Sequence, residues 1–226
     1  MDIAIIIVAV FVVLYVLLFI KALTSTAGGQ GENAVARRLR RLPKDRYFII
    51  NDLMIEKYNG HTTQIDHVVI SPYGVFVIET KNISGYVYGY ELSPQWKRHW
   101  KGYKRNGLYG SDTMIFDNPI LQNGAHIKAL RERLRNYNTR FISIIAFSPK
   151  ATLKVDVHDV DVIYWTEIVD EIKMYHEEVM SIDQAREIYE FLLKINISDK
   201  EQRKAHAERA QRYKNEYMNK QNTIYI

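Results

Sequence analysis

The chain has 226 residues, of which 47% are hydrophobic and 25% charged, a composition that is typical of folded proteins and excludes a largely disordered chain. It contains no cysteine, which excludes disulfide cross-links, cysteine-based zinc sites and a cysteine nucleophile. Lys and Arg number 31 against 26 Asp and Glu, and this formal charge of +5 favours anionic partners weakly.

An unbroken apolar segment opens the chain. Residues 3–20 are 18 consecutive apolar residues, which as a helix would span about 27 Å, close to the thickness of a bilayer's hydrocarbon core. A cleaved signal peptide is the alternative, but such peptides begin with basic residues and have a shorter apolar region. We therefore expect an uncleaved transmembrane anchor over residues 1–22, with Ser25-Thr26-Ala27 as the cleavage site of the alternative.

The charges that flank this segment predict its orientation. Asp2 precedes it, whereas Lys21 and a group of arginines at 37–41 follow it. Because basic residues stay on the cytoplasmic side of membranes, we expect a single-pass protein with its N-terminus outside and the remaining chain in the cytoplasm.

The first half of the remaining chain is rich in strand signals. A small, polar stretch at 23–30 predicts a linker, and apolar residues at helical spacing predict a helix over 32–42. Four strands are then predicted, at 47–50, 64–71, 74–80 and 85–92. The turn Ser71-Pro72-Tyr73-Gly74 joins the second and third of them into a hairpin that is apolar on both faces.

The second half is predicted to be mainly helical. Asn118 followed by proline starts a helix that ends near Arg135, and Thr166 caps another helix. Capping boxes begin at Ser181 and at Ser198. Apolar strands are expected at 141–147 and 160–164.

This order of elements predicts an α/β or α+β domain with a mixed central sheet that is flanked by helices. We expect the main domain over 31–150, an α/β extension of it over 151–197, and a charged helical tail over 198–226. The tail is polar on all sides, so it is expected to be solvated or to bind a protein partner.

Three charged residues gather at the end of the predicted hairpin. Glu79 and Lys81 lie two residues apart on one strand, so their side chains share a face, and Asp66 approaches Glu79 from the neighbouring strand. Two carboxylates about 4 Å apart repel by roughly 4 kcal/mol, and a divalent cation between them reverses that sign. Hard oxygen ligands of this kind suit Mg²⁺ or Mn²⁺.

Two comparisons within the chain bear on this cluster. The triplet Glu171-Ile172-Lys173 has the same spacing but lies in a helical pattern, where residues i and i+2 face apart, and it serves as an internal control. Glu32 falls on the apolar face of its predicted helix and offers a third carboxylate; the alternative is a first-turn glutamate that complements the helix dipole.

These residues resemble the nuclease-related domain (NERD) family of the PD-(D/E)xK nuclease-like superfamily. The resemblance rests on several motifs in order between residues 31 and 147, namely Gly31-Glu32, Gln64-Ile65-Asp66-His67, the stretch 74–82, Asn118-Pro119 and Gln122-Asn123. One departure is Ile65, where the superfamily motif has proline.

The resemblance implies a restriction-endonuclease-like fold and Mg²⁺-dependent cleavage of nucleic acid. It implies that Glu32, Asp66 and Glu79 hold the metal, that Lys81 orients or activates water, and that Gln122 supports the site. We expect DNA rather than RNA as the nucleic acid.

The segment from Tyr86 to Tyr109 combines aromatic and basic residues and contains Glu91 as its one acidic residue. Basic side chains contact phosphates and aromatic rings stack on unpaired bases, so the segment is a candidate nucleic-acid surface. The alternative is a strand and loop that bury their rings. The candidate contact residues are Trp96, Lys97, Arg98, Trp100, Lys101, Lys104 and Arg105.

The sequence thus predicts a membrane-anchored, metal-dependent nuclease. Two alternatives stay open: a catalytically silent nucleic-acid-binding module on a membrane tether, and a scaffold in which Asp66, Glu79 and Lys81 form a structural ion-pair cluster.

Overall fold

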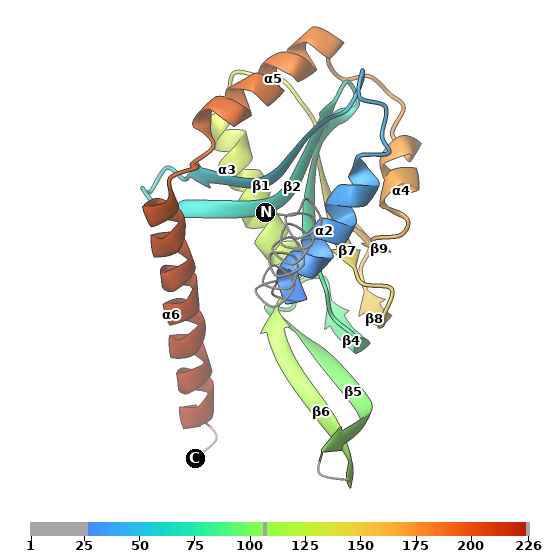
Figure 1. The fold of residues 1–226 in the computed structure, drawn as a ribbon, viewed down its shortest axis with the longest axis vertical. Coiled ribbons are helices and arrows are strands. Elements are labelled where there is room, and N and C mark those ends of the chain that lie inside the picture. The colour runs from blue at the N-terminus through green and yellow to red at the C-terminus, as the bar shows by residue number, and fades with distance from the viewer. Residues whose placement is uncertain (1–26, 106–107, 225–226) are drawn as a thin grey trace, which may run out of the picture.

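The computed structural model describes residues 27–105 and 108–224 (Figure 1). The predicted anchor at residues 1–22 lies outside the described residues. Within the part of the chain that the structure describes, no helix is long and apolar enough to cross a membrane. The predicted linker ends earlier than expected, because residues 27–30 already belong to helix α2 (Ala27–Leu39).

A mixed sheet forms the centre of the molecule, as predicted, and it has five strands. Its strand order is β1-β2-β3-β7-β9, in which β1, β2 and β3 are antiparallel and β3, β7 and β9 are parallel. The strands are β1 (Phe48–Glu56), β2 (Thr62–Ser71), β3 (Gly74–Lys81), β7 (Phe141–Phe147) and β9 (Asp161–Tyr164).

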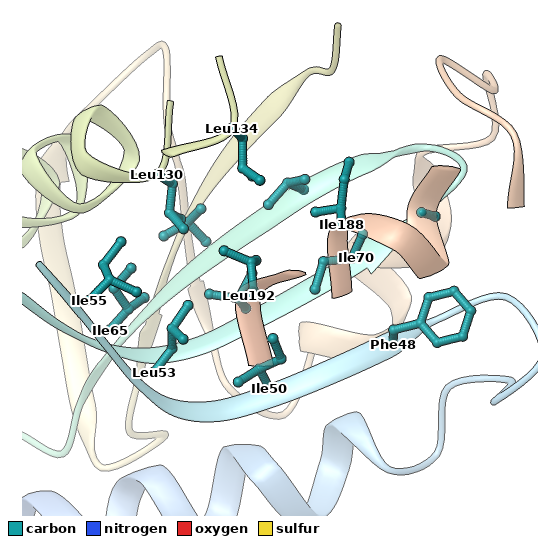
Figure 2. Packing of buried hydrophobic residues seen from close by; sticks show 14 of the residues in the cluster. Phe48, Ile50, Leu53, Ile55, Ile65, Ile70, Leu130, Leu134, Ile188 and Leu192 are labelled. Atoms are coloured by element: carbon teal, nitrogen blue, oxygen red, sulfur yellow. The ribbon is translucent and has the colours of Figure 1, made fainter. Parts of the chain in front are cut away.

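Helices cover both faces of this sheet. On one face, α3 (Pro119–Arg133) and α5 (Ile182–Ile195) pack on a cluster that includes Ile50, Ile65 and Ile70 (Figure 2). On the other face, α2 and α4 (Ile168–Met174) bury the alternate residues of the same strands. Burial on both faces explains why β2 and β3 are almost continuously apolar.

A second sheet, which the sequence did not predict, has the order β6-β5-β4-β8. Its strands are β4 (Gly85–Tyr90), β5 (Gln95–Arg105), β6 (Leu108–Asp117) and β8 (Ala151–Asp156). The paired strands β5 and β6 project from the body as a ribbon, and β6 leads directly into α3 (Figure 1).

The helix starts agree with the capping signals in two places and differ in two. The Asn118 side chain accepts a hydrogen bond from the N–H of Ile120, and Ser181 forms the predicted capping box. Thr166 is not the cap of α4, since Glu167 holds that position without a side-chain hydrogen bond. The last helix, α6 (Lys200–Ile224), is capped by Asp199 instead of Ser198, because the Asp199 carboxylate accepts the N–H of Gln202.

Candidate active site

The turn between β2 and β3 sets the register that brings Asp66 beside Glu79. Gly74 in this turn has φ of 138°, and a Cβ there would lie 2.9 Å from the Arg140 carbonyl oxygen, so a larger residue is excluded. The strands pair from Ser71 with Gly74 to His67 with Ile78. Asp66 and Glu79 occupy the next position along the two strands, on the face that α3 covers.

Beyond that position the strands separate, and side-chain contacts replace the backbone ladder. The Asp66 Oδ2 atom accepts a hydrogen bond of 2.8 Å from the Thr80 N–H. This carboxylate therefore satisfies a backbone donor that a continued strand pair would otherwise need to satisfy. The contact also fixes the orientation of Asp66 toward the end of β3.

Glu79, Lys81 and Gln122 form one hydrogen-bonded group. The Lys81 Nζ donates to Glu79 Oε1 at 2.7 Å and to Gln122 Oε1 at 3.0 Å. The Glu79 side chain is only 4% exposed, so its charge depends on this partner. The structure thus confirms that Glu79 and Lys81 share a face, and it places Gln122 of α3 against Lys81.

His126 is a member of this group that the sequence analysis does not identify. Its Nε2 atom lies 3.5 Å from Glu79 Oε2, and its Nδ1 atom forms a 2.8 Å hydrogen bond with the hydroxyl of Thr63. His126 follows Gln122 by one helical turn, so both side chains point to the same side of α3. That i, i+4 spacing is the sequence signal from which His126 can be found.

The pKa values of the two carboxyl groups of the hairpin are shifted in opposite directions. Burial and the negative charge of Glu79 together raise the pKa of Asp66 to about 8, against the opposing effects of the Thr80 N–H and Lys81. Burial alone would raise the pKa of Glu79 too, but Lys81 and His126 outweigh it and lower that pKa below its ordinary value. In the absence of a cation, one carboxyl group therefore stays protonated beside an ionised one at neutral pH.

Glu32 reaches the electrostatic surroundings of this pair from α2. Burial raises its pKa, and the charges of Asp52 and Glu79 raise it further. Asp52 is a further residue that the sequence analysis does not identify. It interrupts β1 with φ of 58°, a conformation that Asp tolerates better than most residues, and its sequence context, Asn51-Asp52 within an apolar strand, is the available signal.

Asp66 and Glu79 offer oxygen donors that suit a divalent cation. Glu79 Oε2 is buried and makes no hydrogen bond within the described residues. Among those residues, no group of three or more His, Asp or Glu side chains is placed to hold a metal ion. Mg²⁺ is commonly held by only one or two carboxylates together with substrate phosphates, so Asp66 and Glu79 fit this ion. The complete ligand set of Glu32, Asp66 and Glu79 stays a prediction.

The candidate nucleic-acid residues lie on the ribbon and differ in their surroundings. Trp96 is fully buried and its ring stacks on Phe147, so the prediction that Trp96 contacts bases is wrong. The Arg98 side chain is only 13% exposed and pairs with Asp112 at 2.6 Å. Lys97 and Trp100 are exposed, and Lys101, Lys104 and Arg105 belong to the second half of β5.

Comparison with known proteins identifies relatives of this chain. Residues 27–148 match the family model described as nuclease-related domain. The chain is also 37% identical over 182 residues to an uncharacterized protein of Bacillus anthracis, an alignment that covers 79% of this chain and 81% of that protein. No solved structure matches the chain significantly.

Proposed function

Because the chain belongs to the nuclease-related domain family, which is assigned to the PD-(D/E)xK nuclease-like superfamily, we propose that it is a metal-dependent nuclease that hydrolyses phosphodiester bonds. One observation carries this proposal. Asp66 and Glu79 lie side by side where β2 and β3 separate, and Lys81 is held beside Glu79 by Gln122.

The roles of the residues follow from their charges and contacts. Asp66 and Glu79, with Glu32 nearby, would hold Mg²⁺ or Mn²⁺. When bound, such a cation stabilises negative charge on the phosphoryl group and lowers the pKa of a bound water molecule. Asp66 must lose its proton to become a ligand, because burial and Glu79 hold its pKa near 8 without a cation.

Besides a bound cation, the site has a positive charge from the protein, the ammonium group of Lys81. Its ammonium group is fixed between Glu79 and Gln122, so it needs no reorganisation to stabilise charge that develops on the substrate. Gln122 positions Lys81 by accepting one of its three N–H donors, and the remaining donor is available for water or phosphate.

We also propose a membrane anchor, a nucleic-acid contact surface and a protein-binding helix. The 18 apolar residues at 3–20 and the basic residues that follow them support a membrane anchor with the domain on the cytoplasmic side. Lys97, Trp100, Lys101, Lys104 and Arg105 supply the proposed ribbon contacts to nucleic acid, with DNA as the expected substrate. The charged α6 is the proposed contact for a protein partner.

One observation favours the scaffold alternative. The charge of Glu79 is already neutralised by Lys81 at 2.7 Å, which is what a structural ion pair requires. A scaffold of this kind, however, gives no reason for a second buried carboxyl group at Asp66 beside Glu79, where the two raise each other's cost of ionisation.

The test is incubation of the purified protein with end-labelled single- and double-stranded DNA and RNA in Mg²⁺, Mn²⁺ or chelator. We expect cleavage of at least one substrate with metal and none with chelator. Binding without cleavage in every metal condition would select the silent binding module. Neither binding nor cleavage would select the scaffold.

A further inference from the structure

The second sheet has one covered face and one face that the described residues leave open. Alternate residues of its strands, including Val87 and Trp96, pack against the central sheet around Phe147. Because side chains alternate along a strand, Tyr86, Tyr88 and Tyr90 of β4 all point the other way. They are 41%, 46% and 66% exposed, which is unusual for three large rings in a row on a sheet.

The neighbouring strands place charges beside these rings. Tyr88 is directly opposite Lys97 of β5 and directly opposite Lys154 of β8, so one ring lies between two lysines. Tyr86 is opposite His99 and Thr152 in the next row. Side chains that face each other across strands lie on the same face and within contact distance.

The row at Tyr90 has the opposite charge. Tyr90 is opposite Asp156 of β8, and the same edge of the sheet carries Asp117, which is opposite Gln95. An anionic ligand is therefore favoured at Tyr86 and Tyr88 and disfavoured at Tyr90. This contrast within one strand separates a binding surface from a merely exposed aromatic face.

We propose that the face formed by Tyr86, Tyr88, Lys97 and Lys154 binds single-stranded nucleic acid. The two rings lie two residues apart on a strand, about 6.6 Å along it, which allows successive unpaired bases to stack on them. The two lysines contact the phosphates on either side. A duplex keeps its bases stacked inside and cannot use the rings, so the face selects single strands. The identity of the ligand rests on the proposed nuclease function.

The connections of the sheet tie this face to the site. Residues 82–84 alone separate Lys81, the last residue of β3, from β4. On the other side, β6 continues into α3, which carries Gln122. A nucleic-acid strand bound on this face is thus held by segments that are directly connected to the candidate active site.

The experiment measures binding of labelled oligo(dT) and of a duplex of equal length by fluorescence anisotropy. It uses the full chain in detergent with chelator present, so that no cleavage interferes. Tyr86→Ala/Tyr88→Ala should weaken oligo(dT) binding at least about tenfold and leave duplex binding within about twofold. Lys97→Ala/Lys154→Ala should weaken oligo(dT) binding and reduce the magnitude of the slope of log affinity against log salt concentration by about 1.4.

Matched controls come from the same strand and from elsewhere on the surface. Tyr90→Ala should leave oligo(dT) affinity within about twofold, as should Tyr58→Ala, whose ring is also exposed. Tyr86→Phe/Tyr88→Phe should keep most of the affinity, because the ring is retained. For a variant that does not fold, photocrosslinking of the wild-type protein to an iodouridine-containing oligonucleotide replaces it, and peptide mapping should locate the crosslink at Tyr86 or Tyr88.

The outcomes separate this inference from the nuclease proposal. If the wild-type protein cleaves nucleic acid but Tyr86→Ala/Tyr88→Ala binds oligo(dT) normally, the inference is overturned and the nuclease stands. If the wild-type protein binds oligo(dT) but never cleaves, and Tyr86→Ala/Tyr88→Ala no longer binds oligo(dT), the inference stands and the nuclease proposal is overturned. An equal loss in Tyr90→Ala, or a crosslink outside β4, would also overturn the inference.

Discussion

Asp66 and Glu79 lie at matching positions of one hairpin, yet their surroundings treat them differently. Glu79 has Lys81 at 2.7 Å and stays ionised, whereas Asp66 receives one backbone N–H and lies next to that negative charge. In the absence of a cation, such a pair holds one proton and one negative charge at neutral pH. The chemistry of the site therefore depends on single contacts and not only on the presence of two carboxylates.

The raised pKa of Asp66 predicts a pH dependence of folding in chelator. The pKa of this group is about 8 in the folded chain against an ordinary value of 3.8, so its contribution to stability is lost as pH rises from about 4 to about 8. Asp66→Asn removes that contribution and keeps an acceptor for the Thr80 N–H. The free energy of unfolding of the variant should rise relative to wild type across this window in urea titrations. A constant difference between the two proteins would contradict the assignment, and Asp45→Asn on the surface is the control.

Lys81 is predicted to serve stability as well as catalysis. Lys81→Met removes the ion-pair partner of the buried Glu79 carboxylate and leaves it only the more distant His126, which should cost about 3–5 kcal/mol of folding free energy. Glu79→Gln/Lys81→Met should recover most of this loss and remain inactive. Urea unfolding of both variants is the measurement, and Glu171→Gln/Lys173→Met in α4 should change stability by no more than about 0.5 kcal/mol. A stable Lys81→Met variant would show that the ion pair is not needed for folding.

Helices and strands that depend on neighbouring residues could be predicted from the sequence. The apolar hairpin, the Asn118 cap and the Ser181 capping box each depend on neighbouring residues, and the structure has all three. The ribbon strands were missed because β5 is mostly polar and basic, with few apolar residues in alternation. It becomes a strand through pairing with β4 and β6, contacts that a local pattern does not contain.

The close approach of β4 to Trp96 predicts a sharp response to one methyl group. A Cβ on Gly89 would lie 2.3 to 2.5 Å from atoms of the buried Trp96 ring, which itself stacks on Phe147. Gly89→Ala should therefore destabilise the protein by about 1–3 kcal/mol. Gly124→Ala in α3 is the control, since nothing lies within 4 Å of its Cβ, and it should stabilise by about 0.5–1 kcal/mol. Thermal unfolding of both variants checks this, and equal melting temperatures would refute the packing argument.

Helix α6 is predicted to depend on Arg203 for its attachment to the body. The Arg203 guanidinium donates to the Asp52 carboxylate at 2.8 Å, to the Asp52 carbonyl at 2.9 Å and to the Ile197 carbonyl at 2.7 Å. Arg203→Ala removes these bonds, so amide hydrogen exchange in residues 200–212 should accelerate while the core strands stay protected. Arg212→Ala, an exposed change in the same helix, should not alter exchange near residue 200. Unchanged exchange in Arg203→Ala would show that α6 is held by other contacts.

The candidate active site joins segments that are distant in the sequence. The triplet Glu79-Thr80-Lys81 and Asp66 were recognisable from the sequence because they lie on one hairpin, and Gln122 because it belongs to a family motif. Asp52 and His126 were not, because only the folded structure brings Asp52 near Glu32 and His126 to Glu79. The face formed by Tyr86, Tyr88, Lys97 and Lys154 likewise exists only when β8, from a later part of the chain, pairs with β4.

We propose that Asp66 and Glu79 form the metal-dependent hydrolytic centre of this protein. The most direct test is to compare the cleavage rates of Asp66→Asn and wild type on the same labelled nucleic acid in Mn²⁺, with folding of both proteins verified by circular dichroism. We predict that the folded variant in Mn²⁺ cleaves no faster than wild type does in chelator. Cleavage by Asp66→Asn at the wild-type rate would contradict it.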